Sequence, residues 1–376
     1  MIRVVPIVAG EDSEVFIDPW GATLIEDYRR VVEEFGLKPF TDEILRRLPN
    51  PNRLMRRKVV FCHRDLEVII DAIQNRKPFY VLTGIMPSAE KIHLGTKMVV
   101  ENLAYFQGQG AKTYLLVADL EAASTRGISL KESRRRALNF HIPAYIALGV
   151  DPERTTFYFQ SDNRTVMNLA CELSRRVTIS ELRAIYGEIT PGKIMGAMMM
   201  QADVLHPQLE ERIPGVIPVG IDQDPHIRLA RDLAKRTKAQ YGFIPPASIY
   251  HKFTPSLDGS LKMSKSRPET YIELPEDPKS VEKKLWDAFT GGRETAELQR
   301  KLGGRPEVCV VFELFKQHLI EDDEELNRIY EECKSGSRIC GDCKTQATEL
   351  MNRFMERFED RLEEARELIP SITFIK

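Results

Sequence analysis

Four short apolar runs in the middle of the chain alternate with segments that have helical periodicity. They span residues 79–83, 114–118, 156–160 and 216–221. Continuous apolar runs of this length are typical of strands that are buried on both faces of a sheet. Strands that alternate with helices form an open parallel sheet, which binds ligands beyond the carboxyl ends of its strands. The pattern therefore predicts a wound α/β fold with its binding site at that edge.

A helix is predicted directly after the first of these strands. Val99, Leu103 and Phe106 recur at i, i+4 and i+7 and place one apolar stripe on a helix that begins near His93. The N-terminus of a helix presents backbone N–H groups to phosphate, and Gly95 removes side-chain bulk where the backbone must approach adenine. The imidazole of His93 adds a donor, so this segment has the chemistry of a nucleotide site.

A second segment with phosphate-binding chemistry lies downstream. Residues 262–266 read Lys-Met-Ser-Lys-Ser, within a loop at 258–266 that contains glycine and serine. The two lysines act as point charges, and such a loop can move over the β- and γ-phosphates and withdraw with pyrophosphate. By itself this segment also fits an ordinary solvated loop. In this order, the two segments together predict one ATP site.

The paired segments resemble the two signature motifs of class I aminoacyl-tRNA synthetases. A third segment, 220–226, reads Gly-Ile-Asp-Gln-Asp-Pro-His and is similar to the tryptophanyl-tRNA synthetase family. Stretches that begin at Ile17, Phe61, Lys77, Phe289 and Arg305 resemble the archaeal and eukaryotic branch of that family. The resemblance extends from residue 17 to the last residue.

This resemblance implies a fold and a division into domains. The fold is α/β, with a Rossmann-like doubly wound parallel sheet, an N-terminal extension and an α-helical anticodon-binding domain. The implied bounds are 1–75 for the extension, 76–275 for the catalytic domain and 276–376 for the helical domain. An insertion at 122–212 is the implied dimer and acceptor-stem region. Apolar residues at helical spacing between 347 and 369 separately predict a long amphipathic helix.

The activity that the resemblance implies is ATP-dependent condensation of tryptophan to tryptophanyl-adenylate, followed by transfer to tRNA. ATP and Mg²⁺ are the implied cofactors, and a homodimer is the implied assembly. Three alternatives remain open at this point. They are a tyrosine-specific relative, an RNA-binding paralogue that does not charge tRNA, and a small-molecule nucleotidylyltransferase, which would have no need of a helical RNA-binding domain.

The resemblance also assigns roles to individual residues. The implied catalytic residues are His93, Thr96, Lys262 and Lys265. The implied ATP-binding residues are Gly84, Pro87, Ser88, His93, Gly95, Gly220, Asp222, Lys262, Met263, Ser264 and Lys265. The implied tryptophan-binding residues are Glu121, Asp203 and Gln223. Thr96 departs from the family, in which histidine or asparagine is more usual at that position.

Asp203 is the predicted partner of the indole ring. A carboxylate can accept the indole N–H, and a buried acceptor left unpaired would penalise phenylalanine. Leu82 and Leu116 stand where eukaryotic relatives place polar residues against the indole, and Ile85 and Met86 replace an Arg-Gly pair. Recognition of the eukaryotic kind is therefore not expected here. A helix residue that faces solvent or pairs with an arginine is the alternative for Asp203.

Four cysteines form a separate pattern in the C-terminal region. Cys309, Cys333, Cys340 and Cys343 are separated by 23, 6 and 2 residues. Four thiolates can close a tetrahedral site, and some bacterial tryptophanyl-tRNA synthetases with a similar spacing bind a 4Fe-4S cluster. A 4Fe-4S cluster, zinc and four reduced structural thiols are the alternatives. Cys62 and Cys171 lie outside the pattern and are expected in the core.

Two groups of basic residues are open to two interpretations each. One group occurs at 46–58 around Pro49 and Pro51, and the other is the run at 134–136. Each group is either a surface that contacts RNA or an ordinary solvated helix end. Because the net charge is only −2, any surface that binds nucleic acid must be local. The sequence has no long apolar run, so no membrane segment is expected, and a cytoplasmic location is the default.

Overall fold

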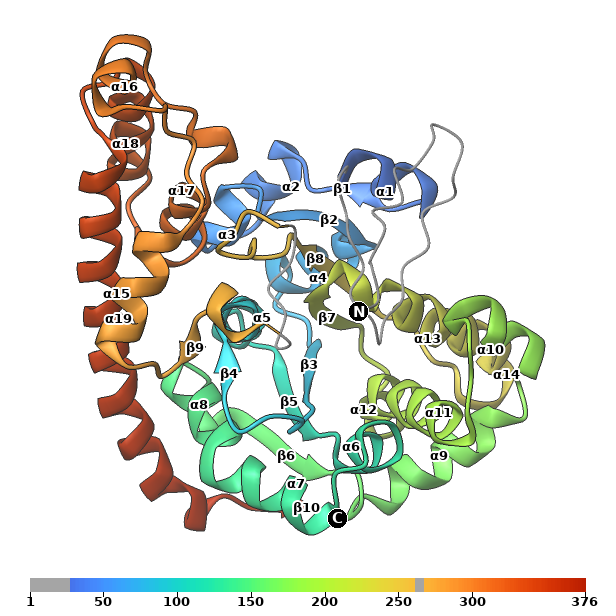
Figure 1. Ribbon diagram of the computed structural model, residues 1–376. Helices are drawn as coiled ribbons and strands as arrows, with labels where there is room; N and C mark the ends of the chain where they lie inside the picture. Colours follow the sequence, from blue (N-terminus) through green and yellow to red (C-terminus); the bar gives the residue numbers. More distant parts are fainter. Residues whose placement is uncertain (1–27, 261–266) are drawn as a thin grey trace.

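The computed structural model describes residues 28–260 and 267–376 (Figure 1). Its main element is an eight-stranded sheet with the strand order β1-β2-β8-β7-β3-β5-β6-β10. The bounds of these strands, in that order, are Lys38–Pro39, Val60–Arg64, Ala247–His251, Gly215–Gly220, Tyr80–Ile85, Lys112–Val117, Thr155–Phe159 and Phe374–Ile375. A separate two-stranded sheet joins β4 (Ile92–His93) to β9 (Glu273–Leu274).

The four predicted strands are confirmed as β3, β5, β6 and β7, with ends within two residues of the predicted ones. They are parallel to one another, in registers such as Gly84 opposite Leu116. The α/β class with a mostly parallel sheet is therefore confirmed. The pattern did not reveal β8, which is parallel to β7, or β2, which pairs with β8 in the antiparallel sense.

Alternate residues of each central strand enter two different hydrophobic cores, one on each face of the sheet. Leu82 and Leu116 belong to the first core, whereas Val81 and Leu115 belong to the second. This explains why the strands are apolar at every position, as is typical of sheets covered on both faces. The predicted helix after β3 is α5 (Leu94–Gly108), which begins one residue after His93.

Helices connect the strands and cover the sheet. Between β1 and β5 these are α2 (Asp42–Arg47), α3 (Arg53–Arg56), α4 (Leu66–Gln74) and α5, and α1 (Tyr28–Glu34) precedes them. Between β5 and β7 the chain forms α6 (Asp119–Arg126), α7 (Leu130–Arg136), the π-helix η1 (Ala137–His141), α8 (Ile142–Ala147), α9 (Arg164–Ser174), α10 (Ile179–Tyr186), α11 (Pro191–Leu205) and α12 (Pro207–Glu210). Between β7 and β8 lie the 3₁₀ turn η3 (Ile221–Gln223), α13 (Asp224–Arg236) and α14 (Lys238–Tyr241).

The C-terminal region is helical. It contains α15 (Pro278–Asp287), α16 (Ala296–Leu302), α17 (Val310–Leu314), the π-helix η6 (Phe315–Leu319), α18 (Asp323–Ser335) and α19 (Cys340–Leu368). The predicted amphipathic helix is thus present as α19, which runs along one side of the molecule in Figure 1. Short 3₁₀ turns lie at Pro152–Arg154, Pro268–Thr270, Pro306–Val308 and Ile369–Ser371.

The predicted domain bounds remain predictions, although the main sheet draws on all three predicted parts. Strands β1 and β2 come from the predicted extension, and β10 comes from the predicted helical domain. Strand β10 lies parallel to β6, with Phe374 opposite Phe157. Among the described residues, no helix is both long and apolar enough to cross a bilayer.

Candidate active site

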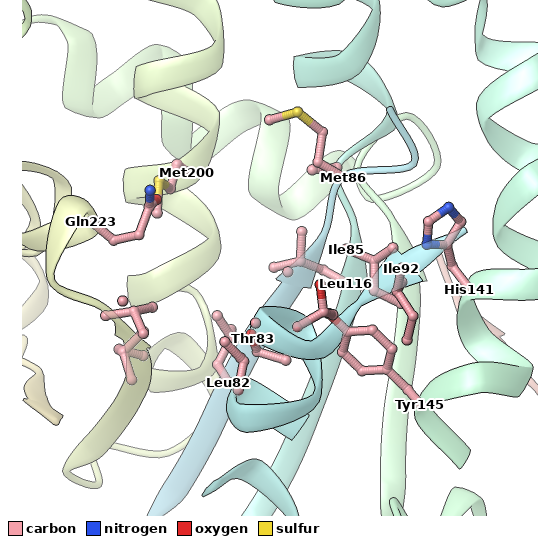
Figure 2. A pocket seen from close by; sticks show the side chains of 18 of the residues that line it. Leu82, Thr83, Ile85, Met86, Ile92, Leu116, His141, Tyr145, Met200 and Gln223 are labelled. Carbon is pink, nitrogen blue, oxygen red and sulfur yellow. The ribbon is translucent and has the colours of Figure 1, made fainter. Parts of the chain in front are cut away.

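A cavity of about 390 Å³ opens at the carboxyl ends of the central strands. Nine of the predicted site residues line it: Gly84, His93, Gly95, Thr96, Glu121, Asp203, Gly220, Asp222 and Gln223. Figure 2 shows Met200 and Gln223 on one side of this cavity and His141 and Tyr145 on the other. The structure therefore brings together residues that are spread over more than a hundred positions of the sequence, as the topology of a parallel sheet requires.

The first turn of α5 has a geometry that only glycine permits. His93 is the N-cap of the helix, and its Nδ1 accepts a hydrogen bond of 3.0 Å from the backbone N–H of Gly95. Because Nδ1 is the acceptor, Nε2 carries the proton of a neutral ring and is the donor. A Cβ atom at Gly95 would lie only 2.8 Å from Cε1 of His93. Gly95 therefore fixes the orientation of the imidazole as well as leaving room for a ligand.

Strands β4 and β9 hold the segment that follows the predicted lysine loop next to the start of α5. His93 pairs with Glu273, and the rings of His93 and Tyr271 meet edge to face, with centroids 6.2 Å apart. Arg267 donates a 2.6 Å hydrogen bond to Asp258 across the base of the loop. Both described ends of the loop are thus tied to each other. The predicted ATP-binding residues Lys262, Met263, Ser264 and Lys265 lie outside the described residues.

Asp203 is a buried carboxylate on α11, with 2% of its surface exposed. Its Oδ1 accepts a 2.9 Å hydrogen bond from the hydroxyl of Tyr158, and its Oδ2 accepts one of 2.6 Å from Nε2 of Gln160. Burial raises the pKa of Asp203 to about 7, although both hydrogen bonds lower it. The solvent-facing alternative for this residue is therefore wrong.

Gln160 connects Asp203 with Glu121, the residue predicted to bind the amino group. Its Oε1 accepts a 3.2 Å hydrogen bond from the backbone N–H of Glu121, which lies in the first turn of α6. Glu121 is buried, with 7% of its surface exposed. The amide of Gln160 thus joins the carboxylate of Asp203 to the backbone of Glu121. Gln160 was missed because a single glutamine at a strand end gives no sequence signal.

Two predicted ATP-binding residues, Pro87 and Ser88, do not line the cavity. The backbone N–H of Ser88 instead donates to the carbonyl of Met86 at 2.7 Å, which makes the turn between β3 and β4. Lys91 of the same turn does line the cavity, and its Nζ donates to the carbonyl of Pro275 at 2.8 Å. Other lining residues that the sequence did not reveal are His141, Tyr145, His251 and Phe253.

The arginines at 134–136 are held by acidic side chains. Arg134 pairs with Asp162 and lies 3.9 Å from the centroid of the Phe159 ring. Arg135 and Arg136 both pair with Glu132 and Glu90. The solvated-helix interpretation is therefore incomplete, because this run braces the turn between β3 and β4 beside the cavity.

The four C-terminal cysteines line one small cavity between α17, α18 and α19. Its free space of about 10 Å³ corresponds to roughly one water molecule. Arg338 donates to the sulfur of Cys343 at 3.1 Å, and the thiol of Cys340 donates to Gln299 at 3.3 Å. Among the described residues, no three Cys, His, Asp or Glu side chains form a group that could hold a metal ion. As placed, the thiols do not fit zinc or a cluster. Of the other two cysteines, Cys62 is buried as predicted, whereas Cys171 is exposed.

Comparison with known proteins agrees with this geometry. The model of the family "tRNA synthetases class I (W and Y)" matches residues 74–356. The chain belongs to this family. The tryptophan–tRNA ligase of Methanocaldococcus jannaschii is 46% identical over 95% of this chain and 97% of its own.

Solved structures of the family show the same fold. The tryptophanyl-tRNA synthetase of Aeropyrum pernix K1 has a TM-score of 0.87 at 44% identity and covers 95% of this chain and 98% of its own. The enzyme of Giardia lamblia has a TM-score of 0.84 at 26% identity, with 93% and 96% covered. The resemblance to tryptophanyl-tRNA synthetases is therefore confirmed, and so is the class I synthetase fold.

The Gly95→Ala variant is expected to lose ATP activation while it stays folded. The new methyl group would displace the His93 ring, and misplacement of a catalytic group by about 1 Å can cost roughly a hundredfold in rate. The measurement is the kcat/KM for ATP in ATP–pyrophosphate exchange. Gly108→Ala is the matched control in the same helix, because a Cβ atom there meets nothing within 4 Å. Equal rates for the two variants would contradict the assigned role of Gly95.

Proposed function

We propose that this chain is a tryptophan–tRNA ligase in which Asp203 recognises the indole ring. Tryptophan, MgATP and tRNA are its substrates. The observation that carries the proposal is the single cavity that contains the start of α5, the carboxylate of Asp203 and an apolar wall of Leu82 and Leu116. An ATP site and an aromatic amino-acid site in one cavity suit the transfer of an adenylyl group to a carboxylate.

The chemical step requires little covalent work from the protein. The carboxylate of tryptophan attacks the α-phosphate in line, the bond to the bridging oxygen breaks, and pyrophosphate leaves with the electron pair. The enzyme must orient the two substrates and stabilise the negative charge that develops. The helix N-terminus at α5, the Nε2–H of His93 and the hydroxyl of Thr96 supply donors, and Lys262 and Lys265 supply positive charge over the leaving group.

Discrimination between amino acids follows from the burial of Asp203. Each carboxylate oxygen accepts one hydrogen bond from the protein, which leaves a lone pair for the indole N–H. A substrate without a donor at this position would leave the acceptor unpaired, at a cost of about 1–3 kcal/mol. Glu121 on α6 and Gln223 in the turn η3 are the proposed partners of the amino and carboxylate groups of the substrate.

ATP–pyrophosphate exchange with each of the amino acids tests the proposed activity. Tryptophan alone is expected to return label from pyrophosphate into ATP. Exchange with tyrosine instead would support the tyrosyl alternative. Exchange without any amino acid would favour a nucleotidylyltransferase, and a complete lack of exchange would favour a paralogue that only binds RNA.

The KM for tryptophan is expected to depend on pH through Asp203. With a pKa of about 7 in the free protein, the carboxyl is neutral below pH 7 and ionised above it. The indole N–H binds the ionised form more strongly, so the KM should rise by up to about tenfold per unit as the pH falls below 7.

The same raised pKa of Asp203 makes the folded state less stable as the pH rises from about 4 to 7, because the unfolded chain releases this proton first.

Asp203→Asn should remove this pH dependence and raise the KM for tryptophan roughly ten- to a hundredfold, with little change in the KM for ATP. Asp232→Asn is the control, since Asp232 lies on the surface of α13 beside Lys235. A variant at position 203 that raises both Michaelis constants equally would argue against indole recognition by this residue.

The C-terminal helices are the proposed anticodon-binding part, and the insertion at 122–212 is the proposed dimer and acceptor-stem region. Ile179 is the first residue of α10, and Met195 lies on α11. The two residues are 50% and 57% exposed. Exposed apolar residues of this kind suit an interface with a second copy of the chain. The mass in solution tests the homodimer, and a mass of one chain at micromolar concentration would refute it.

In this proposal the four cysteines are structural thiols, and metal analysis tests the 4Fe-4S and zinc alternatives. All four cysteines line one cavity with free space of about 10 Å³, and Arg338 donates to the sulfur of Cys343. Anaerobically purified protein with such a cluster contains about four iron atoms per chain and absorbs visible light, whereas a zinc site holds about one zinc. The Cys340→Ser variant should lose the iron and visible absorption of a cluster, or the zinc of a zinc site. Protein without iron and zinc contains four structural thiols.

A further inference from the structure

Two arginines of the N-terminal region, Arg53 and Arg57, are buried against the C-terminal helices. Arg57 donates to the carbonyls of Lys316 and Ile320, both at 2.7 Å, and Arg53 donates to the carbonyl of Gln317 at 3.0 Å. The carbonyls belong to the π-helix η6 and the residue after it, where the helix leaves them without partners of its own. The arginine side chains are 6% and 12% exposed. Both sequence-based interpretations of this basic cluster are therefore wrong for these two residues.

The same Arg53 also binds the helix that carries His93. Its Nη2 contacts Oε1 of Glu101 on α5, and Glu101 pairs in turn with Lys97. Lys97 is 4% exposed, and its Nζ lies 5.4 Å from the centroid of the Phe354 ring on α19. Burial lowers the pKa of Lys97 to about 8, although Glu101 raises it. Buried charges of this kind depend closely on the positions of their partners.

A second contact joins η6 to the segment that leads to the lysine loop. Nε2 of His318 lies 3.0 Å from Oγ1 of Thr254, and the same hydroxyl lies 3.9 Å from the sulfur of Met98 on α5. His318 is 5% exposed, and burial together with nearby cations keeps it neutral by lowering its pKa. Thr254 directly follows Phe253, which lines the cavity.

The π-helix η6 therefore touches both halves of the ATP site. Through Arg53 it holds α5 about two turns after the first residue of the helix, and through Thr254 it holds the segment after β8. The first segment carries the predicted donors at the start of α5, and the second precedes the predicted lysines in the sequence. A change in the position of the C-terminal helices alters both contacts together, because η6 follows α17 and packs against α19.

We propose that Arg53 and His318 are positioning residues for adenylate formation, through which the helical region sets the position of α5 relative to the described segment that follows β8. The inference rests on the ATP-dependent activity proposed above. Apolar contacts would also attach the helical region to α5 and to the segment after β8. Buried ion pairs and hydrogen bonds, in contrast, hold these elements in one geometry.

Two variants of the full chain test the proposal. Thr254→Val keeps the shape of the side chain and removes only the hydroxyl, and Arg53→Met removes the guanidinium. Each is expected to lower the kcat/KM for ATP in pyrophosphate exchange by about tenfold, with the KM for tryptophan unchanged within about twofold. Arg53→Lys should recover only part of the loss, because one ammonium cannot bind the carbonyl of Gln317 and the carboxylates of Glu101 and Glu321 together.

Arg47→Met is the matched control. Arg47 lies in the same N-terminal region but pairs with Asp71 at 2.7 Å and has no contact with the C-terminal helices that the described structure records. It should leave both Michaelis constants unchanged. Thermal unfolding of each variant is measured in parallel, and Thr254→Val is expected to stay folded even where Arg53→Met does not.

The double variant separates coupling from two independent defects. If both residues act through η6, the loss in the Arg53→Met, Thr254→Val chain is smaller than the product of the two single losses. Multiplicative losses, an equal rise in the KM for tryptophan, or unchanged kinetics in folded single variants would each overturn the proposal. Wild-type protein that shows no tryptophan-dependent exchange would instead contradict the proposed function itself.

Discussion

The parallel ladder of β8, β7, β3, β5 and β6 is the constraint on which the rest of the structure depends. Because both faces of these strands are buried, the connecting helices must cover them, and every strand must deliver its last residues to the same edge. The start of α5 and the turn after β7 thereby face each other across one cavity. The topology of the sheet thus determines which segments meet at the site, and their side chains determine its chemistry.

The polar groups of the site are costly to bury, and the structure compensates each one differently. Asp203 accepts two hydrogen bonds, yet burial still raises its pKa. A further donor from the substrate would stabilise its ionised form. His93 is compensated by a backbone N–H, which leaves its other nitrogen as donor. A ligand that donates a hydrogen bond to Asp203 would therefore offset part of the free energy that burial of this carboxylate costs.

The sequence predicted much of this architecture because the central strands are short, apolar and regularly spaced. The strand β2 escaped detection because His63 and Arg64 interrupt its apolar pattern, yet it pairs beside β8. The burial of Arg53 and Arg57 could not be predicted either. The carbonyls that they bind lie more than 250 positions away in the sequence, and backbone carbonyls carry no sequence signal. Asp203 was predictable only through the resemblance, because an isolated aspartate on a helix is ordinarily exposed.

Strand β10 has a consequence for the order in which this protein is made. Phe374 and Ile375 pair with Phe157 and Tyr158 and cover the outer edge of β6. During synthesis, the chain up to β8 can complete the rest of the sheet, but the apolar edge of β6 stays uncovered until residues 374 and 375 emerge. An uncovered edge is a template for pairing with other chains. Until then, this edge of the sheet is open to pairing with a strand of another chain.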